Sequence, residues 1–219
     1  IESQIATYRK ECLLAQPLCI VHRYLDAFVF YDTQISIRVF DPSGVAGDCT
    51  ALQENIVATF LEKIDYKGHL VVRGECVISY PDFKRVNESL PAGVKLYDNP
   101  RNLISGTLKL SDEDVIKDRN PQFIAFTLRY LNDESVLDTV GPRNSWETRQ
   151  LFLKKLGFNI VSYKPVEHPE TDLQSVIDAF TAEVKQYEMP VDGLVLCYED
   201  WDYSLTGGVT GHHATRAGY

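Results

Sequence analysis

The sequence predicts an α+β fold in which antiparallel sheets are flanked by helices. Segments in which apolar side chains alternate with a period of two, typical of strands, recur along the chain, and segments with helical spacing lie between them. Neither an internal repeat nor a low-complexity linker divides the 219 residues. We therefore expect one domain over residues 1–219, with an N-terminal helix at 1–17 and a core at 18–219.

The first part of the chain begins with helical spacing of apolar residues at 1–16. Residues 18–40 then contain two strand-like runs, LCIVHRYLDAFVFYD and QISIRVF, with a turn near Asp32–Thr33 between them. This arrangement predicts a hairpin. Helical spacing returns at 50–64, and the alternation in LVVRGECVIS predicts a strand at 70–79.

The remainder of the chain follows the same rules. Ser145 before a helical pattern predicts an N-cap, and Gly157 after it predicts the end of that helix. Asn99-Pro100 predicts an extended approach to the residues that follow. In chain order, we expect a helix from Pro81–Asp82, a helix capped by Ser111, a strand at 122–131, a helix at 146–157, a short strand at 158–163, a helix at 172–187 and a strand at 190–200.

Composition excludes several classes of function. The net charge of -9 argues against broad electrostatic capture of nucleic acid, so we expect DNA binding by this chain alone to be weak or absent. No apolar run reaches the length of a membrane span and no signal-peptide pattern is present, which predicts a soluble cytoplasmic protein without a membrane partner. The cysteines are odd in number and lack C-x-x-C spacing, which indicates reduced thiols instead of a disulfide framework or a zinc site: Cys12, Cys19, Cys49, Cys76 and Cys197.

One stretch carries the most specific pattern of the sequence. Glu75 interrupts the apolar strand at 70–79, and the segment YDNPRNLISGTLKL follows it with Arg101, Gly106 and Lys109. Considered separately, Glu75 has a simple interpretation as a surface acid of an edge strand and Arg101 as a loop cation, because charged side chains are mostly solvated. Together, in one short stretch, they favour a functional site.

The residues VRGECVISYPDFKRVNESLP, followed by NPRNLISGTLK, resemble the adenylation (nucleotidyltransferase) domain of bacterial NAD-dependent DNA ligases in order, spacing and residue type. The resemblance covers the chain from about Leu18 to Tyr219. It implies a nucleotidyltransferase fold, which is ATP-grasp-like, and a site at which the family forms a covalent enzyme-AMP. In that family a lysine amine attacks the adenylyl phosphorus of NAD, and the AMP then passes to a DNA 5′-phosphate before the nick is sealed.

The lysines that carry this chemistry in the family are replaced here. In the stretch HRYLDA, Tyr24 stands at the position of the nucleophilic lysine, while the aspartate of that motif is kept as Asp26. A tyrosine cannot replace the primary amine that forms a phosphoramidate. In the stretch DGLVLC, Cys197 stands at the position of a lysine that neutralises phosphate. The resemblance therefore implies a degenerate site, without the transition-state electrostatics that usually dominates catalysis, and we assign no catalytic residue.

Other positions keep the residue types of the family, and the resemblance assigns roles to them. Phe126 takes the place of a tyrosine that stacks on adenine, although an apolar strand equally accommodates it as a core residue. Asp192-Gly193 has a second interpretation as a turn that enters a strand. His22 with Cys197 does not define a metal site, because third and fourth ligands are missing at any recognisable spacing. The candidate nucleotide-binding residues are Asp26, Glu75, Arg101, Phe126, Lys185 and Asp192, and the candidates for contact with DNA or phosphate are Lys109 and Arg119.

Three functions are consistent with these residues. The first is a degenerate adenylation domain that no longer transfers AMP and acts as a binding or regulatory module with a protein partner. For this function the resemblance implies NAD or AMP as the ligand. The second is an active NAD-dependent DNA ligase fragment that uses another lysine, requires Mg²⁺ and depends on further domains or subunits. The third is an oligomeric or partner-binding protein without a nucleotide; the replacements at Tyr24 and Cys197 favour the first.

Overall fold

The computed structural model describes the backbone and side chains of residues 66, 68–108, 110 and 112–202, and the backbone alone of residues 18–24, 27–32, 38–40 and 216–218. The helices predicted at 1–16 and 50–64 therefore lie outside the described residues, as do Asp26 and Lys109. Tyr24 is described by its backbone position.

The described strands form two sheets, which we call sheet A and sheet B. Sheet A has the order β7-β1-β8-β9 and its neighbours are antiparallel, whereas sheet B has the order β3-β2-β4-β5-β6. The prediction of antiparallel sheets is wrong at one place, because the short β6 runs parallel to β5. The strands are β1 (Leu18–Tyr24), β2 (Ala27–Asp32), β3 (Arg38–Phe40), β4 (Leu70–Val77), β5 (Gln122–Leu131), β6 (Asn159–Ile160), β7 (Tyr163–Val166), β8 (Val191–Tyr198) and β9 (Arg216–Gly218).

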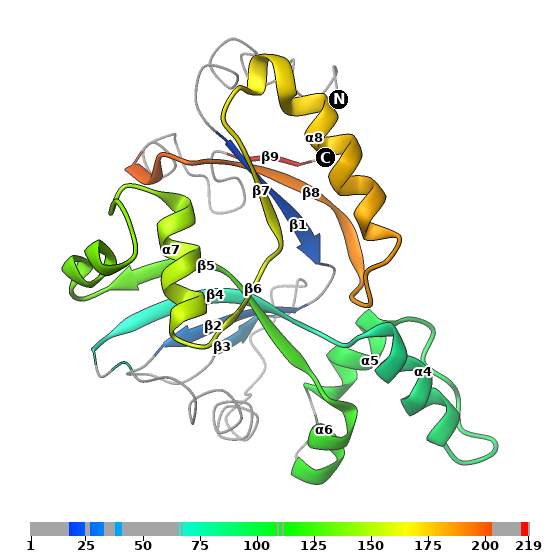
Figure 1. Cartoon of the computed structure of the whole chain (residues 1–219). Helices are drawn as coiled ribbons and strands as arrows, with labels where there is room; N and C mark the ends of the chain where they lie inside the picture. Colours follow the sequence, from blue (N-terminus) through cyan, green and yellow to red (C-terminus); the bar gives the residue numbers. More distant parts are fainter. Residues whose placement is uncertain are drawn as a thin grey trace.

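The first strand-like run of the sequence is divided between the two sheets. β1 lies between β7 and β8 in sheet A, whereas β2 lies between β3 and β4 in sheet B. The predicted hairpin exists as the antiparallel pair of β2 and β3, with Phe28 opposite Phe40. A second short connection, from β6 to β7, also carries the chain between the sheets, as Figure 1 shows.

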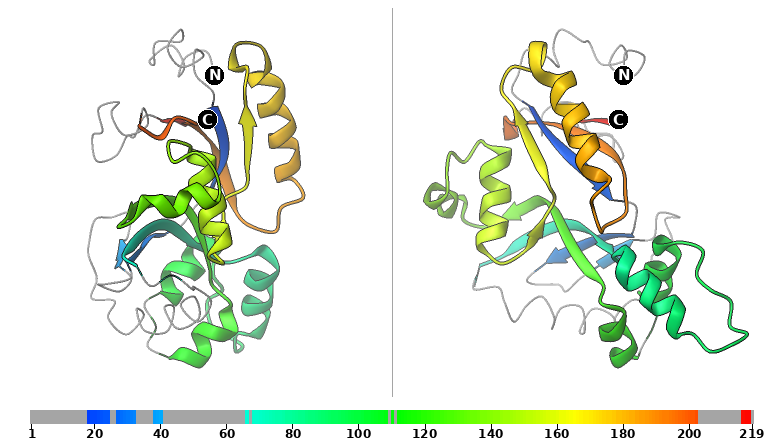
Figure 2. Two further views of the ribbon diagram at one scale, coloured as in Figure 1. Left: turned by 60° about the vertical axis from the view of Figure 1, so that its left-hand side comes forward. Right: turned by 45° about the vertical axis from the view of Figure 1, so that its right-hand side comes forward.

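The helices are distributed over the two sheets. α7 packs on sheet B and α8 covers sheet A, while α4, α5 and α6 follow β4 and lie together at one end of sheet B (Figures 1 and 2). None of the described helices is long and apolar enough to cross a membrane. The bounds are α4 (Tyr80–Ser89), α5 (Pro100–Thr107), α6 (Glu113–Arg119), the 3-10 helix η1 (Glu134–Thr139), α7 (Trp146–Lys155) and α8 (Pro169–Val184).

Local signals explain where α7 begins and ends. The Ser145 hydroxyl accepts a hydrogen bond from the amide of Thr148 at 2.9 Å, which is the predicted N-cap. Gly157 has a φ of 94°, a left-handed conformation that favours glycine after the end of a helix. The predicted cap and the predicted end of this helix are both confirmed.

The segment around Asn99 differs partly from its prediction. Asn99 is extended, with φ -158° and ψ 165°, and its side chain accepts a hydrogen bond from the Asn102 amide at 2.8 Å. Pro100 is the first residue of α5, a position that suits its fixed φ and missing amide hydrogen. The extended approach is therefore confirmed, but it leads into a helix that we did not predict. Asp112, not Ser111, caps the helix that follows.

Three hydrophobic clusters hold these elements together. The largest lies between sheet B and its helices and contains Leu70, Val72 and Phe152. A second joins sheet A to α8. The third, which we call the inter-sheet cluster, joins sheet B to sheet A; it consists of buried Val77, Ile124, Trp146, Val161, Cys197 and Trp201, with Phe126, Tyr163, Met189, Val191 and Val195 packed against them.

Candidate functional site

Glu75 lies in the centre of sheet B and faces the inter-sheet side. β4 is flanked by β2 and β5, and Glu75 is opposite Phe28 on one side and Ile124 on the other. Alternation along β4 places Glu75 on the same face as Val77, which belongs to the inter-sheet cluster. Glu75 is 5% exposed. The interpretation of Glu75 as a surface acid of an edge strand is therefore wrong.

Arg73 shares this face and was missed by the sequence interpretation. Its guanidinium carbon lies 5.5 Å from the centroid of the Phe126 ring, an arrangement in which the ring quadrupole attracts the cation. Phe126 is half-buried and packs against the inter-sheet cluster. Sheet B therefore offers the inter-sheet space a cation, a carboxylate and an aromatic ring from two neighbouring strands. The signal that would have found Arg73 is its spacing of two from Glu75 along a strand.

The facing strand of sheet A presents apolar residues. Val195 and Cys197 belong to the inter-sheet cluster, whereas Leu194, Leu196 and Tyr198 pack toward α8. Cys197 is 6% exposed and carries a reduced thiol. It lies in one hydrophobic cluster with Phe126, so the structure brings these two predicted site residues together.

The backbone register places Tyr24 at the same end of sheet A as the start of β8. Tyr24 is opposite Val191, and a register irregularity separates this pair from Arg23 opposite Gly193. Asp192 is exposed within β8, so its interpretation as part of a turn that precedes the strand is wrong. Lys185 is the exposed C-cap residue of α8.

The remaining predicted cations lie on α5 and α6. Arg101 is exposed in the first turn of α5, and no described residue forms an ion pair with it. Arg119 donates a hydrogen bond to the Thr107 hydroxyl at 3.0 Å, and its guanidinium carbon lies 5.4 Å from the Tyr97 ring. In this structure Arg119 joins α6 to α5, and no described contact links either arginine to Glu75.

A buried glutamine on α7 fixes the backbone of Phe126. The Gln150 side-chain amide donates a hydrogen bond of 3.0 Å to the Phe126 carbonyl, and Gln150 is 1% exposed. The neighbouring Arg149 is 3% exposed; it pairs with Glu134 at 2.9 Å and lies 4.4 Å from the Trp201 ring. The spacing of residues in the sequence does not identify Gln150 as a site residue, because Gln150 contacts the main-chain carbonyl of Phe126 in a different segment.

Glu199 joins the start of α7 to the end of β8. Its carboxylate accepts hydrogen bonds from the Ser145 hydroxyl and, at 3.2 Å, from the Glu147 amide, while its carbonyl accepts one from the Trp146 amide at 2.8 Å. A carboxylate at a helix N-terminus is stabilised by the exposed amide groups and the helix dipole. These contacts tie the helix of sheet B to the strand of sheet A.

The ionisable group with the clearest environment on α4 is Asp82. Burial would raise its pKa, but hydrogen bonds from Ser79, Asn120 and Arg85 outweigh burial, and the pKa of Asp82 is lowered overall. This network connects α4 to α6, outside the inter-sheet space. Among the described residues, no group of three or more His, Cys, Asp and Glu side chains is arranged to hold a metal ion.

The arrangement of two sheets with flanking helices defines the fold of this protein as an α+β nucleotidyltransferase fold. A solved structure named "Pmar-Lig_Pre" aligns with 90% of this chain and 42% of its own, with a TM-score of 0.52 and 13% identity, which is a likeness of fold. The predicted α+β nucleotidyltransferase fold is confirmed.

The family follows from sequence comparison. A model described as NAD-dependent DNA ligase adenylation domain matches residues 44–217, and the chain belongs to this family. It is 33% identical over 182 residues to a DNA ligase of Ruminiclostridium cellulolyticum, covering 83% of this chain and 26% of that protein. It is 30% identical over 168 residues to a DNA ligase of Lachnoclostridium phytofermentans, covering 77% and 24% respectively. The chain thus spans about a quarter of the length of these relatives.

Proposed function

We propose that this adenylation domain has lost adenylyl transfer and acts as a binding or regulatory module that holds AMP or NAD weakly. The observation that carries the proposal is the environment of Cys197. The family position of a phosphate-neutralising lysine is here a buried thiol inside the inter-sheet cluster, 6% exposed. Negative charge developing on a phosphate beside this strand would meet an apolar wall, where an unpaired charge is costly to bury.

The replacement at Tyr24 supports the same proposal. A phosphoramidate requires an amine, and a phenol has a reference pKa of about 10 and a different leaving-group chemistry. Tyr24 lies opposite Val191 in sheet A, at the position that β1 contributes beside the start of β8. The departures at Tyr24 and Cys197 thus both fall on sheet A. On sheet B, Glu75 and Phe126 are residue types suited to contact with a ribose and an adenine.

The direct test is covalent labelling. The chain is incubated with NAD or ATP labelled in the adenylate phosphate, with Mg²⁺, then denatured and examined by intact mass spectrometry. We expect no protein-bound AMP. The Tyr24→Lys variant, treated identically, tests whether a nucleophile alone is sufficient. An acid-labile AMP adduct on the unmodified chain would disprove the loss of adenylyl transfer.

The binding part of the proposal is tested separately by calorimetry with AMP, NAD and nicotinamide mononucleotide. Base stacking on an aromatic side chain contributes about 1–3 kcal/mol, so Phe126→Ala is expected to weaken AMP binding by about fivefold to a hundredfold. The matched control is Tyr130→Ala, which removes an exposed aromatic ring of the same strand. Absence of heat with all three nucleotides would favour a partner-binding protein that takes no nucleotide.

The second candidate is an active ligase fragment, and one observation favours it. Glu75, the carboxylate that the family keeps beside the ribose, remains buried on the inter-sheet face, although burial of a carboxylate is costly. This candidate predicts an AMP adduct that disappears when one particular lysine is replaced by arginine, or nick sealing in the presence of further domains. Labelling followed by peptide mapping distinguishes the two candidates.

A further inference from the structure

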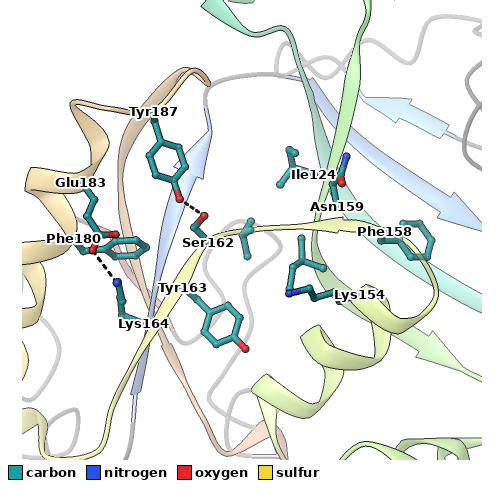
Figure 3. A pocket seen from close by; sticks show the side chains of 12 residues that line it. Ile124, Lys154, Phe158, Asn159, Ser162, Tyr163, Lys164, Phe180, Glu183 and Tyr187 are labelled. Atoms are coloured by element: carbon teal, nitrogen blue, oxygen red, sulfur yellow. Dashed lines mark hydrogen bonds and ion pairs between the residues drawn. The ribbon is translucent and has the colours of Figure 1, made fainter.

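A groove of about 600 Å³ lies outside the inter-sheet site, over the connection from β6 to β7 (Figure 3). Lys154 in the last turn of α7 lines it on one side, and Glu183 near the end of α8 and Tyr187 beyond it line the other. Its volume lies within the range of about 300–1,000 Å³ that small-molecule sites occupy. None of the predicted nucleotide-binding residues lines this groove.

The two lysines that line the groove differ in their partners. Lys164 is 2.8 Å from the Glu183 carboxylate, so its charge is compensated within the protein. Lys154 is exposed and pairs with no carboxylate among the residues that the structure describes. Figure 3 shows the Lys154 side chain extending from α7 toward the middle of the groove. An anionic group in the groove would therefore be attracted chiefly by Lys154.

The Ser162 hydroxyl, which also lines the groove, has a proton that it can donate to a ligand. The Tyr187 hydroxyl donates to the Ser162 Oγ, as the dashed line in Figure 3 marks. Because Ser162 accepts this bond, its own proton is available for an acceptor. A carboxylate, sulfonate or phosphate oxygen is the acceptor that would also satisfy the neighbouring lysine.

The floor of the groove is apolar. Ile124, Ile160 and Val161 line it, and Ile124 and Val161 are at the same time members of the inter-sheet cluster. Apolar side chains beside a few convergent polar groups are the usual composition of a site for an organic ligand. Val161 and Ile124 are almost fully buried, so half-buried Ile160 provides the accessible part of this floor and the polar groups orient the ligand.

We propose that this groove binds a small planar organic anion. The ring lies on Ile160, and the acidic group lies between the Lys154 ammonium and the Ser162 hydroxyl. The proposal is independent of the proposed function, because it uses neither Tyr24 nor Cys197 and does not require a nucleotide. Since Ile124 and Val161 also belong to the inter-sheet cluster, an occupied groove borders the packing that supports Phe126.

The experiment uses naphthalene-2-sulfonate as the probe and the amide signals of residues 159–164 in nuclear magnetic resonance spectra as the readout. We expect saturable shifts confined mainly to these residues. The neutral 2-naphthol and inorganic sulfate supply the ring and the anion separately, and each is expected to bind at least tenfold more weakly than the probe. Equal shifts with sulfate alone would overturn the proposal, as would the absence of saturation at 159–164.

Two neighbouring lysines provide a matched pair of variants. Lys154 and Lys155 both lie in the last turn of α7, but Lys155 donates to the Thr139 hydroxyl at 3.1 Å and does not line the groove. Lys154→Glu reverses an exposed charge beside the anion and is expected to weaken binding of the probe by about tenfold. Lys155→Glu carries the same change in net charge, and its dissociation constant for the probe is expected to lie within twofold of that of the unmodified chain. Equal weakening by both variants would show a nonspecific charge effect and contradict the site.

Discussion

The two walls of the inter-sheet space have different chemistry. Sheet B contributes Arg73, Glu75 and the Phe126 ring, whereas sheet A contributes Val195 and Cys197. A wall with a cation, a carboxylate and a ring suits the adenosine half of a nucleotide. Among the side chains that the structure describes, the opposite wall is apolar, and Cys197 stands at the position where the family has a lysine that neutralises phosphate. Under the proposed function, this difference means that a nucleotide site loses its phosphate side while the strands that carry the nucleoside side remain.

The largest expected effect comes from returning a charge to the apolar wall. Cys197→Lys places an ammonium in the inter-sheet cluster, and an uncompensated buried charge is expected to lower the free energy of unfolding by about 3–5 kcal/mol. Urea unfolding measures this loss. Asp192→Lys, in the same strand but exposed, is the control and is expected to change stability by less than about 0.5 kcal/mol. An unchanged stability of Cys197→Lys would mean that this wall is open to water.

A smaller loss of stability is expected when the hydrogen bond from Gln150 to the backbone of Phe126 on sheet B is removed. Gln150→Leu keeps the volume but removes the donor to the Phe126 carbonyl, which leaves a buried acceptor without its bond and costs about 1–3 kcal/mol. Thermal unfolding measures the change. Gln174→Leu, which removes an exposed side-chain hydrogen bond to Asp178, serves as the comparison and is expected to be nearly neutral. Equal effects of the two variants would contradict a specific role for Gln150.

The smallest expected change in stability concerns Asp82 on α4, which lies outside the inter-sheet space. The hydrogen bonds to Asp82 lower its pKa in the folded state, so the stability it contributes is present above its unfolded pKa of about 3.9 and is lost as the pH falls through the lower folded value. Asp82→Asn is therefore expected to lose about 1 kcal/mol near neutral pH and to approach the unmodified chain at an acidic pH below the folded-state pKa of Asp82. Urea midpoints at both pH values measure this. Asp98→Asn, at an exposed ion pair, is the control, and a difference for Asp82→Asn that persists at low pH would contradict the assignment.

Much of the fold was predictable because its signals are local. Alternation identified the strands at 70–79, 122–131 and 190–200, and β4, β5 and β8 occupy them. Ser145 and Gly157 correctly predicted the limits of α7, because a cap and a left-handed residue act on their immediate neighbours. The division of the first run into β1 and β2 was not predicted. Alternation reports which side chains share a face, but not which distant strand pairs with which.

The site was only partly predictable for the same physical reason. The resemblance directed attention to Glu75 and Cys197, but whether Glu75 lies at an edge or in the centre depends on the pairing of β4 with β2 and β5. Gln150 and Arg73 act through a carbonyl and a ring that other segments bring to them. Arg119 carried the expected charge, yet it packs on Tyr97 between two helices. The roles assigned to all the candidate residues stay predictions, and Asp26, Lys109 and the Tyr24 side chain lie outside what the structure describes.

The pairing of β1 with β8 has a consequence for synthesis on the ribosome. These strands lie far apart in the sequence, with Cys19 opposite Cys197, so sheet A cannot close until residues 191–198 have been synthesised. The ladder between β4 and β5 joins closer segments and can form earlier. Until β8 emerges, β1 can pair only with β7, and its other edge is a template for wrong pairing.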